Sequence, residues 1–227
     1  MQSSYDLLYA LKQLDYLKTD RDPLWWPGSR TFEVVVGALM TQQTKWERVE
    51  ESLENLKTHD LLTLQALSSA SSQEIAQLIK PSGFYNTKAP RLKLLCTNIL
   101  NEFGSFGSFQ KQVDREWLLT QKGIGMESAD SILCYGCARE VFVVDSYTNR
   151  LLSAFGYEFD HYIQIQEWVQ AGIEENLSKV KDIYKYEIKL HMIYARFHGK
   201  IVEYAKEHIK GKHADIKPLI QCMEGKT

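Results

Sequence analysis

Apolar side chains recur at the three- and four-residue spacing of amphipathic helices along most of this chain. Pro23 and Pro27 interrupt the pattern, and segments 81–83 and 104–108 are typical of turns. The valine-rich stretch 141–144 predicts a short extended connector and no sheet. The pattern therefore predicts an all-α protein, with helices near residues 5–17, 32–40, 49–56, 75–79, 89–103, 113–119, 126–137, 146–155, 163–176, 183–197 and 201–209.

Composition is that of a globular protein, with 44% hydrophobic and 25% charged residues in a chain of 227. The first thirty residues mix charged with apolar positions, so we expect no signal peptide. No apolar run approaches the roughly 20 residues that cross a membrane. Four dispersed cysteines fit a reducing compartment. These features predict a cytoplasmic protein without a membrane partner, and we expect a monomer.

Charge is unevenly distributed along the chain. The net charge of −2 does not indicate a nucleic-acid binder. Residues 176–227, however, carry ten Lys and one Arg against two Asp and four Glu. Such a bias either holds phosphates on a basic face or is simply a solvated helical surface, and the sequence leaves both readings open.

Two glycines one residue apart, Gly123 and Gly125, follow Lys122 between two predicted helices. Glycine lets backbone N–H groups approach a ligand closely, and the start of a helix suits an anion such as phosphate. The pattern is typical of a helix-hairpin-helix element that grips DNA without reading its sequence, with Lys122 adding charge. A tight helix–helix turn with no ligand is the alternative.

Further segments carry a resemblance to a known family. The hairpin with Ala129 and Val143-Val144-Asp145 behind it, and segments 39–44 and 194–200, resemble the endonuclease III superfamily of base-excision DNA glycosylases. The resemblance implies that Gln42 fills the space left by a flipped base. Separately, we expect Lys200 to contact DNA. Buried amide hydrogen bonds of Gln42, and pairing of Lys200 with Glu203, are the alternatives.

The chain departs from that family at two places. In bifunctional members a lysine two residues after the second hairpin glycine attacks the sugar, whereas this position here is Glu127, which cannot form an imine. We therefore expect a monofunctional enzyme that leaves DNA strands intact. Many members hold an iron–sulfur cluster through four cysteines near the C-terminus, but only Cys222 lies there. We expect neither a metal nor another cofactor, and we interpret Cys134 and Cys137 as buried structural cysteines.

Asp145 stands where the extended connector becomes a helix. Capping the backbone N–H groups of that helix is its plain role. In the family resemblance, the same carboxylate stabilises the oxocarbenium that develops at C1′ and orients water. The two roles are compatible, because the start of a helix favours an ionised carboxylate.

Indole side chains suggest the substrate. Trp25-Trp26-Pro27 and Trp46 are expected to line a pocket for an extruded base, and indole faces suit a cationic ring. With the hairpin segment, Trp-Trp-Pro resembles the 3-methyladenine glycosylases of the endonuclease III class. Tryptophans that merely fill the core are the alternative.

The sequence thus predicts two helical lobes, residues 28–136 with the hairpin and residues 1–27 plus 137–227, flanking a cleft that binds DNA and the base. The resemblance implies hydrolysis of the N-glycosidic bond of alkylated purines, chiefly 3-methyladenine, in double-stranded DNA, as part of base-excision repair at the bacterial nucleoid. A glycosylase for another lesion and a non-catalytic damage-binding protein are the alternatives.

Overall fold

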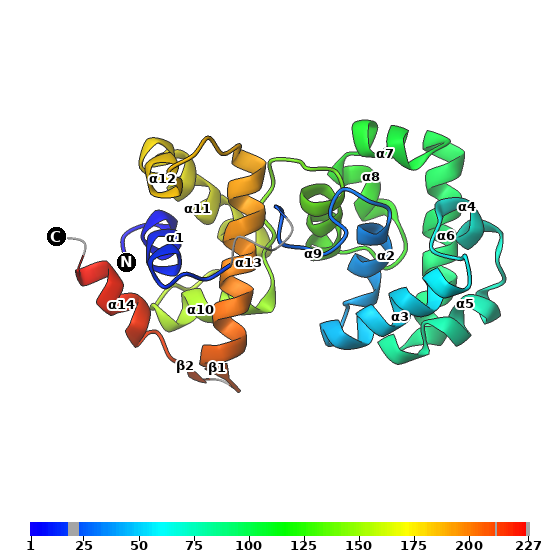
Figure 1. The fold of residues 1–227 in the computed structure, drawn as a ribbon, viewed down its shortest axis with the longest axis horizontal. Helices are drawn as coiled ribbons and strands as arrows, with labels where there is room; N and C mark the ends of the chain where they lie inside the picture. Colours follow the sequence, from blue (N-terminus) through cyan, green and yellow to red (C-terminus); the bar gives the residue numbers. More distant parts are fainter. Residues whose placement is uncertain (18–22, 212, 226–227) are drawn as a thin grey trace. The chain divides into compact units, whose positions relative to one another are not determined.

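The computed structural model describes residues 1–17, 23–211 and 213–225. The chain folds into two compact units, unit 1 comprising Met1–Trp26 with Glu140–Thr227 and unit 2 comprising Pro27–Arg139. The lobes predicted at 28–136 and at 1–27 with 137–227 stay a prediction. Nearly all regular structure in the described part is helical (Figure 1), as the all-α prediction requires.

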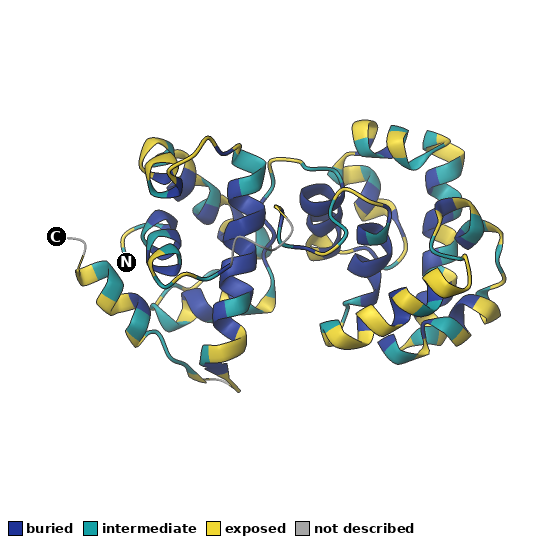
Figure 2. Cartoon of the chain, viewed as in Figure 1, coloured by how far each residue is buried: buried dark blue, intermediate teal, exposed yellow. Residues whose placement is uncertain are grey.

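Unit 1 is built around the long helix α13, Leu190–His208, which packs against α1 and α10 (Figure 1). Its middle is buried almost all round, shown in dark blue in Figure 2, so this helix forms the centre of the unit's core. The other elements of the unit are α1 (Ser4–Gln13), α10 (Ser146–Ala154), α11 (Tyr162–Glu174), α12 (Leu177–Tyr184), β1 (Ile209–Lys210), β2 (His213–Ala214) and α14 (Lys217–Glu224).

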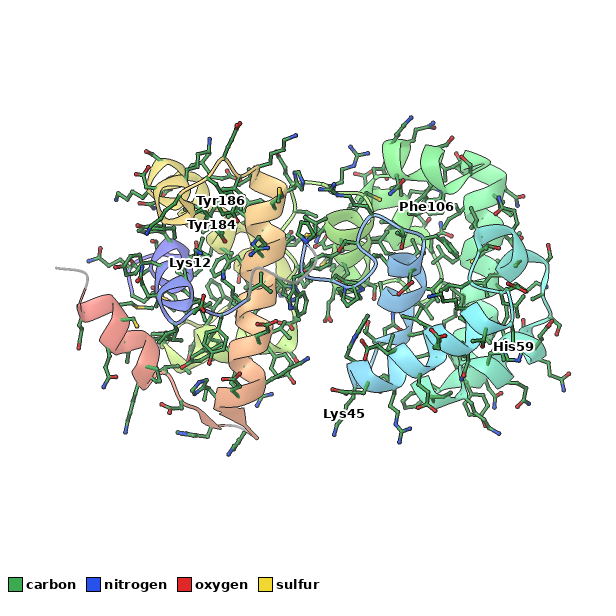
Figure 3. The ribbon with its side chains drawn as sticks, in the orientation of Figure 1. Lys12, Lys45, His59, Phe106, Tyr184 and Tyr186 are labelled. Carbon is green, nitrogen blue, oxygen red and sulfur yellow. The ribbon has the colours of Figure 1, made fainter. Side chains whose placement is uncertain are left out.

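Helix α12 is attached to α1 through an aromatic contact. The Lys12 ammonium of α1 lies 5.2 Å from the centre of the Tyr184 ring, and the Tyr186 ring meets Tyr184 edge-on (Figure 3). A cation over an aromatic face is attractive because the ring face is electron-rich. Tyr184 itself is buried in the core of unit 1.

Unit 2 contains the predicted hairpin and is centred on α2, Glu33–Met40, in which every residue after the first is buried. The hairpin connects α8 (Arg115–Thr120) with α9 (Met126–Ser131), which continues as the π-helical turn η2 (Ile132–Gly136). The remaining elements are α3 (Trp46–Thr58), α4 (Leu64–Ser69), α5 (Ser72–Leu78), η1 (Lys80–Ser82), α6 (Tyr85–Phe103) and α7 (Phe106–Gln112).

Several details differ from the sequence-based elements. Helix α4 was not predicted, and residues 185–189, expected inside a helix, separate α12 from α13. The expected break near His198 is wrong, because α13 continues through it to His208. The expected loop 104–108 is shorter, since the Ser105 side chain accepts a hydrogen bond from Ser108 N–H and starts α7 at Phe106. The antiparallel pair β1–β2 and the final helix α14 were not predicted, since strands of two residues are too short to show an alternating pattern.

Candidate functional site

Asp145 lies at the N-cap of α10 in unit 1. Its Oδ1 accepts hydrogen bonds from the Thr148 N–H (2.7 Å) and the Thr148 hydroxyl (2.9 Å), so the capping role is present. Its Oδ2 lies 3.5 Å from Nε2 of His198 on α13. Burial acts to raise the pKa of Asp145, but the contacts with His198 and Thr148 outweigh it and hold the pKa below its usual value. The carboxylate is therefore ionised at neutral pH, as stabilisation of a developing cation requires.

Trp25 packs directly on the helix that carries His198. Its ring meets the His198 ring edge-on at 5.6 Å, and its Nε1–H donates to Glu203 Oε1 at 3.1 Å. A Cβ at Gly199 would lie only 2.4 Å from Cγ of Trp25, so glycine permits this approach. The structure thus brings Trp25 to the His198–Asp145 pair within unit 1.

The other predicted pocket residues have different environments. Trp26 is buried and meets Trp25 edge-on at 6.4 Å, which fits the alternative of a core tryptophan. In unit 2, Pro27 and Trp46 line a pocket of about 390 Å³ together with several glutamates, Glu33, Glu50, Glu51 and Glu54. Whether all four predicted residues form one pocket stays a prediction.

The charge of this unit 2 pocket is mainly negative. Burial is the largest influence on Glu33 and raises its pKa, Lys57 lowers it, and Glu54 raises it further. Trp46 contributes an aromatic wall to the same pocket. An aromatic and acidic pocket favours a cationic over a neutral planar ligand.

Gln42 is connected to the hairpin inside unit 2. Its Nε2 donates to Gly123 O at 2.8 Å and to Ser128 Oγ at 3.0 Å. These are the amide hydrogen bonds that the sequence left as an alternative to insertion into DNA. Insertion of Gln42 into a duplex therefore requires that these bonds break, and it stays a prediction.

Lys88 holds the loop that carries Gln42, and sequence reasoning missed it. Its buried ammonium donates to Met40 O, Thr44 Oγ1 and Ser82 O at 2.7, 2.8 and 2.8 Å. Burial lowers the pKa of Lys88 to about 8. Three acceptors match the three donors of the ammonium, so one side chain connects the end of α2, the following loop and η1.

The remaining predicted residues divide by exposure. Lys122, Gly125 and Glu127 are exposed on the hairpin and the first turn of α9. Lys200, in contrast, is buried in unit 1, where its Nζ donates to Tyr16 O. This burial argues against the predicted DNA contact of Lys200, and we do not retain that contact in the proposal below.

The cysteines are located in the described part of the chain, which also contains other possible metal ligands. All four cysteines are free thiols, and Cys134 and Cys137 lie in and directly after the π-helical turn η2. Burial raises the pKa of Cys137 to about 12, so it stays protonated. Within residues 1–17, 23–211 and 213–225, no group of His, Cys, Asp or Glu is arranged to hold a metal ion. Over the same ranges, no helix is both long and apolar enough to cross a membrane.

Sequence reasoning missed His198 and Arg91, whose contact partners lie far away along the chain. His198 belonged to a segment with a family resemblance, but no role was assigned to it. Arg91 lies in an ordinary amphipathic helix, and no sequence signal relates it to Gly123, against which it packs.

Comparison with known proteins places these features in context. Residues 36–172 match the family described as HhH-GPD superfamily base excision DNA repair protein. A Methanocaldococcus jannaschii protein, MJ1434, which carries the name of a DNA repair glycosylase, is 36% identical over 93% of this chain and 92% of its own length.

Solved structures extend the comparison. Helicobacter pylori 3-methyladenine DNA glycosylase (MagIII), crystallised with 1,N6-ethenoadenine, is 46% identical with a TM-score of 0.88, covering 92% of this chain and all of that one. A trapped endonuclease III–DNA covalent intermediate shares the fold at 18% identity and a TM-score of 0.66, covering 98% of this chain and 96% of that one.

Proposed function

Because the chain belongs to the HhH-GPD superfamily of base excision DNA repair proteins, we propose that it is a monofunctional glycosylase for alkylated purines, chiefly 3-methyladenine. The observation that carries this proposal is the partly buried, ionised carboxylate of Asp145 beside His198 in a chain with Glu127 at the lyase position. The likeness to the H. pylori 3-methyladenine glycosylase over the length of both chains supports the choice of substrate.

The chemistry follows from the charge of the substrate. Alkylation at N3 makes adenine cationic, so the bond between C1′ and N9 breaks with its electron pair passing to the base, which leaves as a neutral molecule. Asp145 stabilises the oxocarbenium that develops at C1′ and accepts a proton from the water that adds there. Little acid assistance is required, because the leaving group already carries its positive charge.

The unit 2 pocket supports a cationic base. Trp46 and Pro27 line it with Glu33, and an extruded 3-methyladenine would meet both an indole face and negative charge there. A neutral purine gains neither the cation–π attraction nor the Coulomb attraction. This difference favours alkylated over undamaged adenine without a dedicated hydrogen-bond donor.

Base release and strand cleavage together distinguish a monofunctional glycosylase from a strand-cutting glycosylase and from a damage-binding protein. Purified protein is incubated with methylated duplex DNA, released bases are identified by chromatography, and strand breaks are scored before and after alkali treatment. We expect release of 3-methyladenine, with breaks only after alkali. Release together with direct breaks would contradict the monofunctional assignment, and absence of any release would favour a damage-binding protein.

A further inference from the structure

Arg91 of α6 packs against the first glycine of the hairpin. A Cβ at Gly123 would lie 2.6 Å from Arg91 Cδ and 3.0 Å from both Nε and Nη1. Gly123 also has φ +88, a conformation that disfavours other residues. Glycine is therefore required here both for the turn and for the approach of this guanidinium.

The charge of Arg91 is not neutralised by any described residue. Its Nε is buried without a hydrogen-bond partner, and no ion pair or hydrogen bond of its guanidinium occurs within residues 1–17, 23–211 and 213–225. A buried donor left without an acceptor destabilises the folded protein. A bound ligand that supplies the missing acceptor would remove this destabilisation.

The backbone of the hairpin has matching unused donors. Ile124 N–H donates to Gln121 O, but in the described part of the chain neither Gly123 N–H nor Gly125 N–H has a protein acceptor. The Gly123 carbonyl is engaged by Gln42 Nε2. The N–H groups of Gly123 and Gly125 are thus available to a ligand, while the Gly123 carbonyl is already hydrogen-bonded. The Arg91 guanidinium packs against Gly123.

We propose that Arg91 is a phosphate-binding residue, whose guanidinium contacts the DNA phosphate held by the amides of Gly123 and Gly125. The proposal rests on the proposed DNA glycosylase function and adds a residue to it. Guanidinium suits this position because its planar fork bonds two phosphate oxygens at once. Lys122, exposed on the same hairpin, adds a second positive charge without the packing contact.

The test measures the salt dependence of binding to a duplex that contains a tetrahydrofuran abasic analogue, which the enzyme cannot hydrolyse. Arg91→Met keeps the aliphatic stem on Gly123 and removes the charge. Each phosphate contact contributes a slope of about −0.9 to log K against log salt. We expect this variant to lose one such contact. Between 50 and 200 mM salt, its binding constant should therefore fall by a factor about 3.5 times smaller than that of the wild type.

Arg48→Met is the matched control, because Arg48 is an exposed arginine of unit 2 paired with Glu51 on α3. It is expected to keep the wild-type slope. An Arg91→Met slope equal to that of the wild type would overturn the proposal, even if affinity fell. Base release by the wild type is scored separately, so failure of the glycosylase function is distinguishable from failure of this contact.

A measurement on the unaltered protein keeps the proposal testable if Arg91→Met does not fold. The Nε–H signal of Arg91 in NMR spectra is assigned from its loss in Arg91→Lys. We expect this signal to shift and to exchange more slowly with water when the abasic duplex is added. An unchanged signal at saturating DNA would exclude the contact.

Discussion

His198 Nε2 lies 3.5 Å from Asp145 Oδ2, although the two residues stand on different helices of unit 1. The contact lowers the pKa of Asp145 against the opposing effect of burial. The rings of Trp25 and Phe142 meet the His198 ring edge-on, at 5.6 and 6.1 Å between ring centres. The aromatic surroundings fix the direction of the imidazole, and the imidazole stabilises the carboxylate.

Replacing His198 is expected to change the pH dependence of base release. In the proposed mechanism, base release requires the ionised Asp145 and is lost as pH falls through its pKa, which is depressed in the folded protein. His198→Gln removes one cause of the depression, so the acid limb of the rate profile moves to higher pH. His208→Gln, on the same helix, is the control and should leave the limb in place. Identical limbs for wild type and His198→Gln would exclude this role.

Asp145→Asn separates catalysis from capping. Asn is as good an N-cap as Asp, so α10 is expected to keep its stability. Without the carboxylate, single-turnover release of 3-methyladenine should fall by about 10²–10⁴-fold, while binding to the abasic duplex is retained. Wild-type turnover by this variant would contradict the catalytic assignment.

Glu127→Lys tests the meaning of the lyase position. The side chain at this position is exposed in the first turn of α9, so lysine fits without repacking the core. We expect borohydride to trap a covalent complex between this variant and methylated DNA, because an amine can form an imine with the sugar. Wild type should give none. A trapped complex with the wild type would reveal a different nucleophile.

Gly199→Ala is expected to displace Trp25. The added Cβ would lie 2.4 Å from Trp25 Cγ, and overpacking of this kind costs about 1–3 kcal/mol of unfolding free energy. Gly107→Ala in α7 is the matched control. Its Cβ meets open space, so urea denaturation should show a gain of about 0.5–1 kcal/mol. A neutral or stabilising effect of Gly199→Ala would contradict the close contact.

Lys200 makes stability depend on pH. Burial lowers its pKa from 10.5 to about 7 in the folded protein. Above that pH the unfolded chain binds more protons than the folded one, so the stability contribution of this group rises with pH. Lys200→Met should therefore reduce the slope of unfolding free energy between about pH 7 and 9 by up to about 1.4 kcal/mol per pH unit.

The exposed Lys206 on the same helix provides the control for that measurement. Lys206→Met is expected to keep the wild-type slope, because the Lys206 side chain is exposed to solvent. Urea denaturation at several pH values gives the unfolding free energy of the wild type, Lys200→Met and Lys206→Met. Equal slopes for the wild type and Lys200→Met would show that the Lys200 ammonium is not desolvated.

Local features of the sequence predicted much of the outcome. The helical spacing predicted an all-α fold, and the resemblance to the endonuclease III superfamily is confirmed by the family match over residues 36–172. Asp145 was predicted as a helix cap, which needs only its place before a helix, and the structure has that cap. The break predicted near His198 was wrong because a helix tolerates glycine when a partner packs on it, as Trp25 does on Gly199.

The sequence by itself determined which groups are available: the hairpin glycines, a carboxylate before α10, and Glu127 in place of a lysine. Only the tertiary structure decided how these groups are tuned. It placed His198 beside Asp145 and packed Arg91 against Gly123. It also buried Lys200, whose Nζ donates a hydrogen bond to Tyr16 O. The physical reason is that such contacts join residues far apart along the chain. They depend on the packing of whole helices, which the spacing of residues within one helix does not reveal.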